Sequence, residues 1–256
     1  MNGLGPQSVA LPLENAKVAI LGYDAAGRAH ALALRGAGSN VTVGVRLSGM
    51  SWVRARKDGF DAESAAVAVS GANIVVVLVP DEEQPGLYFH AIENHVPKGA
   101  LLVFGRGLPL ATGAFDPRDV DAVFVAGDGK QCRVGVHRDA TGRALERATA
   151  YARAVFGQDA RVGTTTIEAE VAAELAAAAE RAGGYNALLR EAERGFARQC
   201  ESHAPDEAKV AFYDRLKELI AAHAWPVNGR ASERRSATSL VNIPVGRRGT
   251  GGGSRS

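Results

Sequence analysis

The amino-acid sequence predicts an α/β protein, with a Rossmann-type doubly wound parallel sheet followed by a smaller all-helical domain. Between Lys17 and about Val162, short β-branched runs alternate with Ala-rich helical stretches. Runs that are apolar on both faces and separated by helices are typical of parallel strands covered on both sides. Beyond about Gly163, residues that strongly favour helix replace the strand-forming segments. We therefore expect a nucleotide-binding domain over 1–162 and a helical domain over 163–245.

The elements follow from this pattern in chain order. The predicted strands are KVAILGY, NVTVGVR, NIVVVLVP, ALLVFG, DAVFVAG and CRVGVH. The stretch from Asp139 to Gly157 has apolar residues at helical spacing and predicts the last helix of the first domain. In the second domain we expect a helical stretch from Thr166 to Gln199 and a helix between Pro205 and Pro226. The Gly-, Ser- and Arg-rich segment 246–256 is expected to be a disordered tail.

Composition narrows the classes of function. A formal charge of +2 over 256 residues gives no indication of a nucleic-acid or membrane partner. Cys132 and Cys200 are the only cysteines, too few for a disulfide framework or a thiolate metal site. No apolar run approaches the roughly 20 residues that span a bilayer. We expect a soluble cytoplasmic protein that acts on a small molecule.

The stretch VAILGYDAAGRAHALALRGAGSNVTVGVR has the layout of a dinucleotide-binding βαβ unit. In the G-x-G-x-x-G pattern the first glycine permits a tight turn, and the third allows close packing of helix against strand. Gly22 and Gly27 keep these two roles, and Asp24 stands where the middle glycine is usual. Tyr23 and Arg28 complete the candidate nucleotide-binding segment.

Asp24 has two interpretations. Its carboxylate can face the pyrophosphate, where like charges about 5 Å apart repel by roughly 3 kcal/mol at an effective dielectric near 20. Arg28, one turn later, can then pair with Asp24 or reach a phosphate. Alternatively, Asp24 caps the helix that begins near Ala25, as aspartate often does.

The second predicted strand ends in GVRLSGMSW. An acidic residue at this position suits the free 2′-hydroxyl of NAD, whereas an arginine suits the 2′-phosphate of NADP. Arg46 therefore favours NADP, and Ser48 and Ser51 are candidate hydroxyl donors. The alternative is that Arg46 is a solvated surface charge.

Four segments together resemble the short-chain form of ketol-acid reductoisomerase (acetohydroxy acid isomeroreductase). These are VAILGYDAAGRAHALALRGAG, VTVGVRLSGMSWVRARKDGF, VPDEEQ and VHRDATGRALERATAYA. The resemblance implies an NADPH- and magnesium-dependent enzyme of branched-chain amino-acid biosynthesis, with a helical, knotted domain that interlaces two subunits. It supports Arg46, Ser48 and Ser51, and it adds Asp81 on the nucleotide side.

The resemblance also implies a metal centre between two helices. Asp214 and Glu218 match the second acidic pair, as magnesium ligands, and Glu218 would also serve catalysis. At the first pair, alignment places Ala173 and Ala177, while a register shift offers Glu170 and Glu174. Arg106 stands where the family has a catalytic histidine. In the segment GRASERRSATSL, Ser236 and Thr238 offer hydroxyls for substrate.

Three functions remain open on these residues. The chain is an NADP(H)-binding oxidoreductase that acts on a small 2-keto or 2-hydroxy acid, or a catalytically inactive homologue with a structural or regulatory role. In the third interpretation it is an oxidoreductase with new chemistry, in which Arg106 orients an anionic substrate and no metal is needed. In each case we expect a homodimer through the helical domain, because 163–245 is short for burying all its apolar positions.

Overall fold

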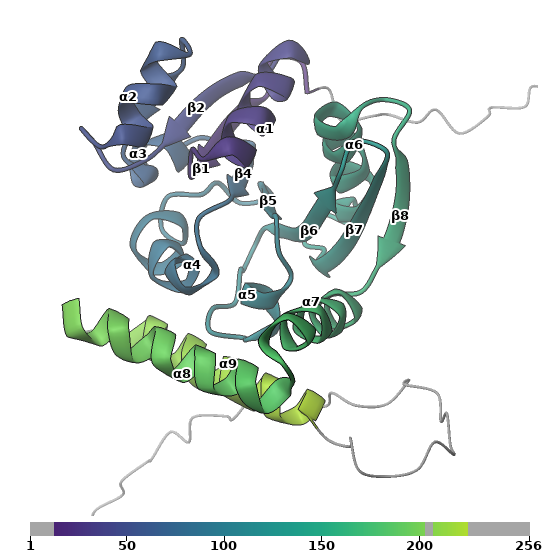
Figure 1. Ribbon diagram of the computed structural model, residues 1–256. Coiled ribbons are helices and arrows are strands. Elements are labelled where there is room, and N and C mark those ends of the chain that lie inside the picture. The colour runs from purple at the N-terminus through teal and green to yellow at the C-terminus, as the bar shows by residue number, and fades with distance from the viewer. Residues whose placement is uncertain (1–12, 203–206, 225–256) are drawn as a thin grey trace, which may run out of the picture. The chain divides into compact units, whose positions relative to one another are not determined.

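A computed structural model describes residues 13–202 and 207–224. Within these residues the strands form one eight-stranded sheet of order β3-β2-β1-β4-β5-β6-β7-β8 (Figure 1). All neighbouring strands are parallel except β6 and β7. The strands are β1 Lys17–Leu21, β2 Asn40–Gly44, β3 Asp61–Glu63, β4 Ile74–Val77, β5 Leu101–Phe104, β6 Asp121–Gly127, β7 Gln131–Arg138 and β8 Arg161–Thr165.

Helices connect these strands and follow the last of them. The α-helices are α1 Ala25–Gly36, α2 Met50–Lys57, α3 Ala65–Val69, α4 Gln84–Leu87, α5 Leu108–Ala111, α6 Ala144–Phe156, α7 Ile167–Ala182, α8 Tyr185–Ser202 and α9 Glu207–Ala224. A 3-10 helix, η1 Asp81–Glu83, and a π-helix, η2 Tyr88–Ile92, flank α4. No described helix is long and apolar enough to cross a membrane.

The central strands bury both of their faces, as the continuous apolar runs predict. Along β1, Val18 and Ile20 belong to one core cluster, and Ala19 and Leu21 belong to the other. Helices α1, α2 and α6 contribute to the first cluster, while α3, α5 and α7 contribute to the second. The sheet is thus covered on both sides, which confirms the predicted doubly wound α/β fold.

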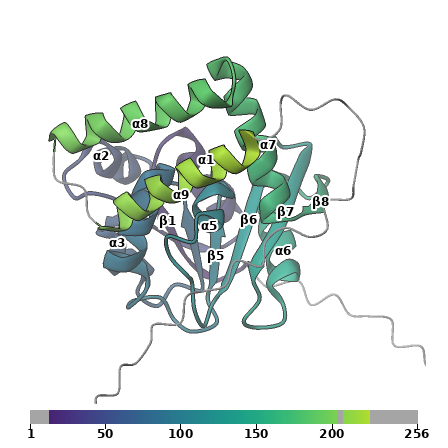
Figure 2. The same cartoon turned by 90° about the horizontal axis from the view of Figure 1, so that it is seen from below.

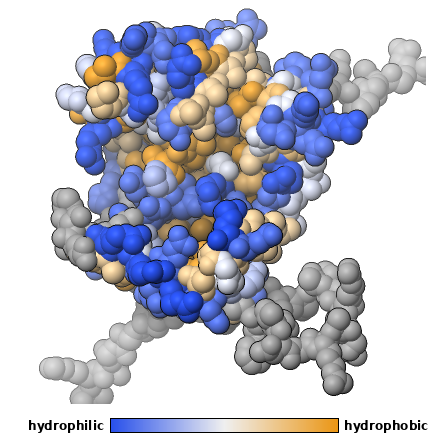
Figure 3. Space-filling view, viewed as in Figure 1, coloured by the Kyte–Doolittle hydropathy of each residue, from blue (hydrophilic) through white to orange (hydrophobic). Residues whose placement is uncertain are grey.

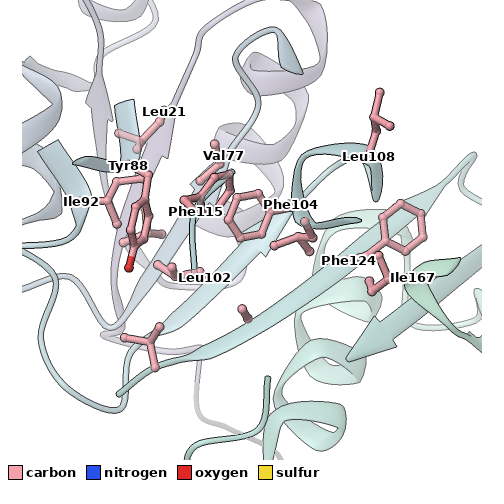
Figure 4. Packing of buried hydrophobic residues seen from close by; sticks show 14 of the residues in the cluster. Leu21, Val77, Tyr88, Ile92, Leu102, Phe104, Leu108, Phe115, Phe124 and Ile167 are labelled. Carbon is pink, nitrogen blue, oxygen red and sulfur yellow. The ribbon is translucent and has the colours of Figure 1, made fainter. Parts of the chain in front are cut away.

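The second cluster contains a group of packed aromatic rings (Figure 4). The rings of Tyr88 and Phe115 stack with centroids 4.8 Å apart, and Phe104 lies 5.8 Å from Phe115. Ile167, the first residue of α7, is 3% exposed in the same cluster. Helix α7 therefore shares the core of the sheet.

The helical segment continues this packing. Phe212 and Ile220 of α9 are buried in the same cluster, and Leu188 of α8 packs against it. Gly183 and Gly184 separate α7 from α8, and Gly183 takes the left-handed conformation, φ 87°, that ends α7. The predicted domain boundary at 162/163 stays a prediction, and Pro205, Pro226 and the tail 246–256 lie outside the described residues.

The six predicted strands are present, but the sheet has two further strands, β3 and β8, that were not predicted, and one pair of its strands is antiparallel. Strand β8 ends at Thr165, close to the predicted end of the strand-forming sequence near Gly163. Its residues are mostly polar, because β8 forms an edge of the sheet, and an edge strand does not need an apolar run. Strands β6 and β7 are antiparallel, since the short segment DGK turns the chain between them and no helix intervenes.

Candidate functional site

The carboxyl ends of the parallel strands bring the predicted site residues to one edge of the sheet. Gly22 directly follows β1, Arg46 follows β2, Asp81 follows β4 and Arg106 follows β5. The strand order runs outward in opposite directions from the neighbours β1 and β4. In an open α/β sheet, ligands bind in the crevice outside this point of reversal. The topology thus selects this edge as the candidate site.

The turn after β1 depends on its two glycines. Gly22 has φ 98°, a conformation that side chains with a Cβ rarely adopt. A Cβ on Gly27 would lie 2.2 Å from the carbonyl oxygen of Gly22. The first turn of α1 therefore packs directly on the end of β1, as predicted for the first and third glycines of a dinucleotide-binding turn. This cradle fits a dinucleotide phosphate at the amino end of α1.

Asp24 is the N-cap of α1. Its backbone is extended, and its side-chain Oδ1 accepts a hydrogen bond of 2.9 Å from the backbone N–H of Gly27. The geometry is that of the capping interpretation. The carboxylate also occupies one of the first N–H groups of the helix, which are the groups that bind phosphate in such turns.

Arg28 pairs with Asp58 instead of Asp24. The guanidinium of Arg28 makes two hydrogen bonds to the Asp58 carboxylate, of 2.7 and 3.1 Å. The Tyr23 hydroxyl donates a third to Oδ2 of Asp58, at 2.8 Å. Hydrogen bonds from Arg28 and Tyr23 hold the pKa of Asp58 below its usual range, while burial raises the pKa of Tyr23 to about 12. The Tyr23 side chain is 2% exposed and belongs to the same core cluster as Val18 and Ile20.

The segment after β2 is open at its surface. Arg46 and Ser48 are exposed, and Ser48 adopts the left-handed conformation with φ 62°. Ser51 lies in the first turn of α2, where its hydroxyl accepts a long bond of 3.4 Å from Arg54. These positions suit a solvent-facing adenosine ribose, and their contact with a 2′-phosphate stays a prediction.

Arg106 lies between two carboxylates. Its Nε is 2.8 Å from Oδ2 of Asp81, and its Nη2 is 3.6 Å from Oε2 of Glu174 on α7. The backbone N–H of Gly107 donates to Oε1 of Glu174 at 3.4 Å. Burial raises the pKa of Asp81 to about 6, with Arg106 opposing and Glu174 reinforcing the shift. Burial also raises the pKa of Glu174.

A pocket of about 330 Å³ adjoins this group. Its wall joins Arg106 and Glu174 to apolar side chains of α7, α8 and α9, and α9 also contacts η1 and α4. Figure 2 shows α8 and α9 side by side next to α7. The lining residues of the pocket are Arg106, Leu108, Glu174, Leu175, Ala178, Leu188, Glu191, Ala192, Gly195, Arg198, Tyr213, Leu216 and Ile220. The pocket thus combines the charged groups of Arg106, Glu174, Glu191 and Arg198 with apolar side chains, as is usual for small-molecule sites.

The predicted acidic pair on α9 lies apart from this chemistry. The side chains of Asp214 and Glu218 are 58% and 65% exposed. Each forms an ion pair of 2.7 Å with a cation three residues away on the same helix, Lys217 and Arg215 respectively. No group of three or more potential ligands stands together in the described part of the chain. This donor set does not fit a magnesium centre, and the catalytic role of Glu218 stays a prediction.

Two charged partners of the residues at this edge of the sheet were not indicated by the sequence alone. Asp58 follows α2 in a KDG turn, which resembles an ordinary surface turn. Arg133 of β7 reaches Oε1 of Glu170 with its Nε at 2.6 Å, and Glu170 is buried. The residues of each pair are 30 or more positions apart in the chain, so no local sequence spacing indicates that they are in contact. Ser236 and Thr238 lie outside the described residues.

Two solved structures show the fold. The chain is similar to an NADH-preferring ketol-acid reductoisomerase from an uncultured archaeon, with 28% identity and a TM-score of 0.59. The similarity covers 80% of this chain and 66% of that protein, so the chain spans just under two thirds of its length. A semialdehyde dehydrogenase NAD-binding protein from Cupriavidus necator, in complex with calcium and NAD, has 16% identity and a TM-score of 0.57. That likeness covers 81% of this chain and 83% of the other, and it concerns the fold.

A family model identifies the relationship. The model for the NADPH-binding domain of acetohydroxy acid isomeroreductase matches residues 12–161. The matched region contains the glycine turn, Arg46, Asp81 and Arg106, and it ends where β8 begins. By this match the chain belongs to the acetohydroxy acid isomeroreductase family, also called ketol-acid reductoisomerase, through its NADPH-binding domain.

Proposed function

We propose that the chain is an NADP(H)-dependent oxidoreductase that acts on a small 2-keto or 2-hydroxy acid, without the magnesium-dependent isomerisation of its family. The observation that carries the proposal is the position of Arg106. Its side chain stays 58% exposed while it contacts Asp81, and it borders the pocket formed with α7, α8 and α9. A guanidinium binds a carboxylate with two parallel hydrogen bonds, so Arg106 can orient the acid group of a substrate.

Asp81 supports proton transfer at the same place. A carboxyl whose pKa is raised to about 6 by burial can exchange a proton near neutral pH. Reduction of a keto group requires one hydride and one proton. The nicotinamide cofactor supplies the hydride when bound, and Asp81 is the group that we assign to the proton.

Arg46 supports NADP over NAD. It follows β2, is exposed, and has no acidic residue among its neighbours from Val43 to Ser51. A 2′-phosphate would gain charge-assisted hydrogen bonds there, whereas NAD would not. The related archaeal enzyme is described as NADH-preferring, so the cofactor must be measured for this chain.

A titration of the purified protein with NADPH and NADH, followed by nucleotide fluorescence, tests the cofactor assignment. We expect tighter binding of NADPH, and an increase of about tenfold in its dissociation constant for Arg46→Ala, with little change for NADH. Lys57→Ala removes one positive charge from the exposed end of α2 and serves as the matched control. Equal affinities of the unmutated protein for both cofactors would contradict the assignment.

Turnover tests the reaction. NADPH oxidation is followed with acetolactate and, separately, with an already rearranged 2-keto acid. We expect oxidation with the rearranged acid alone. Turnover of acetolactate would show that the isomerisation is retained.

The second candidate is a catalytically inactive homologue with a structural or regulatory role. The observation in its favour is the Asp24 carboxylate, which caps α1 where a phosphate would bind. Failure of the protein to bind either nucleotide would select this candidate over the oxidoreductase.

A further inference from the structure

The acidic face of α7 is neutralised by two arginines, Arg133 of β7 and Arg106 of the loop after β5. Glu170 and Glu174 are one turn apart, so both lie on the same face of the helix. Arg133 contacts Glu170 at 2.6 Å, and Arg106 approaches Glu174 to 3.6 Å while it also contacts Asp81 at 2.8 Å. Each carboxylate of this face therefore has a permanent cation beside it.

We propose that these guanidinium groups take the place of divalent cations in this chain, with Arg106 as the built-in cation between Asp81 and Glu174. A divalent cation bound by these two carboxylates would have to occupy the space of the Arg106 guanidinium. Arginine does not lose its charge in proteins, so it cannot yield the place by deprotonation. The pocket accordingly binds its ligand without magnesium.

The ligand chemistry leads to the same conclusion. Magnesium requires near-octahedral oxygen coordination at about 2.0–2.1 Å and usually takes one or two carboxylates with several waters. Asp81 and Glu174 together would be sufficient if the guanidinium were removed. The Oε2 atom of Glu174 is buried and accepts no hydrogen bond from the described residues, with Arg106 as its ion-pair partner. The cation site is thus formed by the fold and filled by the chain itself.

The second acidic pair does not compensate. Asp214 and Glu218 are exposed and paired with Lys217 and Arg215 on their own helix. The inference concerns the same site as the proposed function, but it requires neither nucleotide binding nor turnover. Its test uses manganese alone, so its failure can be distinguished from failure of the proposed function.

The experiment titrates the full chain with Mn²⁺ and follows the free ion by electron paramagnetic resonance, without nucleotide or substrate. Up to about 1 mM Mn²⁺, we expect the unmutated protein to show no Mn²⁺ binding that the Glu174→Gln substitution would remove. Arg106→Gln should increase the affinity for Mn²⁺ at least tenfold, because it frees Asp81 and Glu174. The Arg106 side chain is largely exposed, so this variant should fold, and circular dichroism checks that it does.

Matched control variants show whether a gain in Mn²⁺ affinity arises at the Asp81 and Glu174 carboxylates. Arg215→Gln removes an exposed arginine from the Glu218 ion pair and should leave Mn²⁺ binding unchanged. The double variant Arg106→Gln with Glu174→Gln should lose the gained site. The proposal is overturned if the unmutated protein binds Mn²⁺ and Glu174→Gln abolishes that binding. It is equally overturned if Arg106→Gln folds and gains no affinity.

Discussion

At the scale of single residues, the site depends on what each charged group has as its partner. Asp24 accepts from the N–H of Gly27, Arg28 binds Asp58, and Arg106 lies between Asp81 and Glu174. With other partners, the same side chains would form a site with a different charge distribution. An Arg28–Asp24 pair, for example, would have reduced the negative charge at the phosphate position, and the observed Arg28–Asp58 pair does not.

Asp24 offers a test of its two effects. Asp24→Ala removes the cap and should lower the free energy of unfolding by about 1 kcal/mol. Asp24→Asn keeps a side-chain oxygen for the Gly27 N–H, so its stability should change by less than about 0.5 kcal/mol. Both variants remove the negative charge and should tighten NADPH binding, by up to roughly 3 kcal/mol if water is excluded. Chemical denaturation and nucleotide titration measure the two effects, and weaker nucleotide binding by Asp24→Asn would refute the repulsion.

At the scale of elements, the close approach of α1 to β1 places the amino end of the helix at the phosphate position. Gly27→Ala should disrupt this contact, because the new Cβ would lie 2.2 Å from a backbone oxygen. We expect a loss of more than about 2 kcal/mol in the free energy of unfolding, together with weaker nucleotide binding. Gly36→Ala, on the same helix, meets nothing within 4 Å and should be neutral or stabilising. Similar melting curves for both variants would contradict the packing.

The contact between α1 and α6 predicts a pH dependence. Nδ1 of His30 lies 2.6 Å from the Tyr151 hydroxyl, and both residues are buried. Burial lowers the pKa of His30 from 6.5 to about 4. Between these two values the unfolded chain takes up a proton that the folded chain excludes. Stability is therefore retained above about pH 6.5 and falls as the pH decreases toward 4.

His30→Gln should abolish this part of the acid sensitivity, as measured by unfolding free energies at pH 7 and pH 4.5. Tyr151→Phe should cost about 1–3 kcal/mol at pH 7, since it leaves the buried Nδ1 without its hydrogen bond. An unchanged acid sensitivity in a folded His30→Gln protein would assign that sensitivity to other groups.

At the scale of the whole molecule, the apolar side chains that remain exposed or partly exposed indicate where a second copy of the chain could bind. Figure 3 shows hydrophobic colour on the surface over α2, where Met50 and Val53 are 73% and 49% exposed. Along α8 the apolar side chains of Leu188, Leu189 and Phe196 pack against the core but are not fully buried. A second copy that covers α8 would complete their burial, which supports the dimer proposed through the helical domain.

Sedimentation velocity at micromolar concentration should give twice the chain mass of 26.7 kDa. Leu189→Arg would place a charge in the proposed interface and should shift the protein toward the monomer. Met50→Arg, on α2, is the control outside the helical segment. A monomer at these concentrations would contradict the dimer.

The sequence by itself determined the class of fold and the edge that carries the site. Continuous apolar runs specify buried parallel strands, and residues directly after such runs must gather at one edge of the sheet. Gly22 and Arg46 could be placed there for this reason, whereas Asp81 and Arg106 were indicated by the resemblance to the family. The six strand positions follow from equally local chemistry, whereas the break between α7 and α8 at Gly183 was not predicted within the expected helical stretch.

Tertiary structure alone decided the partners of the charged residues. The Arg28–Asp58 and Arg133–Glu170 pairs join residues 30 and 37 positions apart, on different elements. The sequence gives the sign of a charged residue and the local structure around it. Which opposite charge lies nearest to it depends on how the elements pack. The antiparallel β7 and the polar edge strand β8 were likewise fixed by their neighbours in the sheet. For the same reason the sequence left Asp24 and Arg106 ambiguous, since what a capping carboxylate or a pocket arginine does depends on the groups that packing brings within hydrogen-bonding distance.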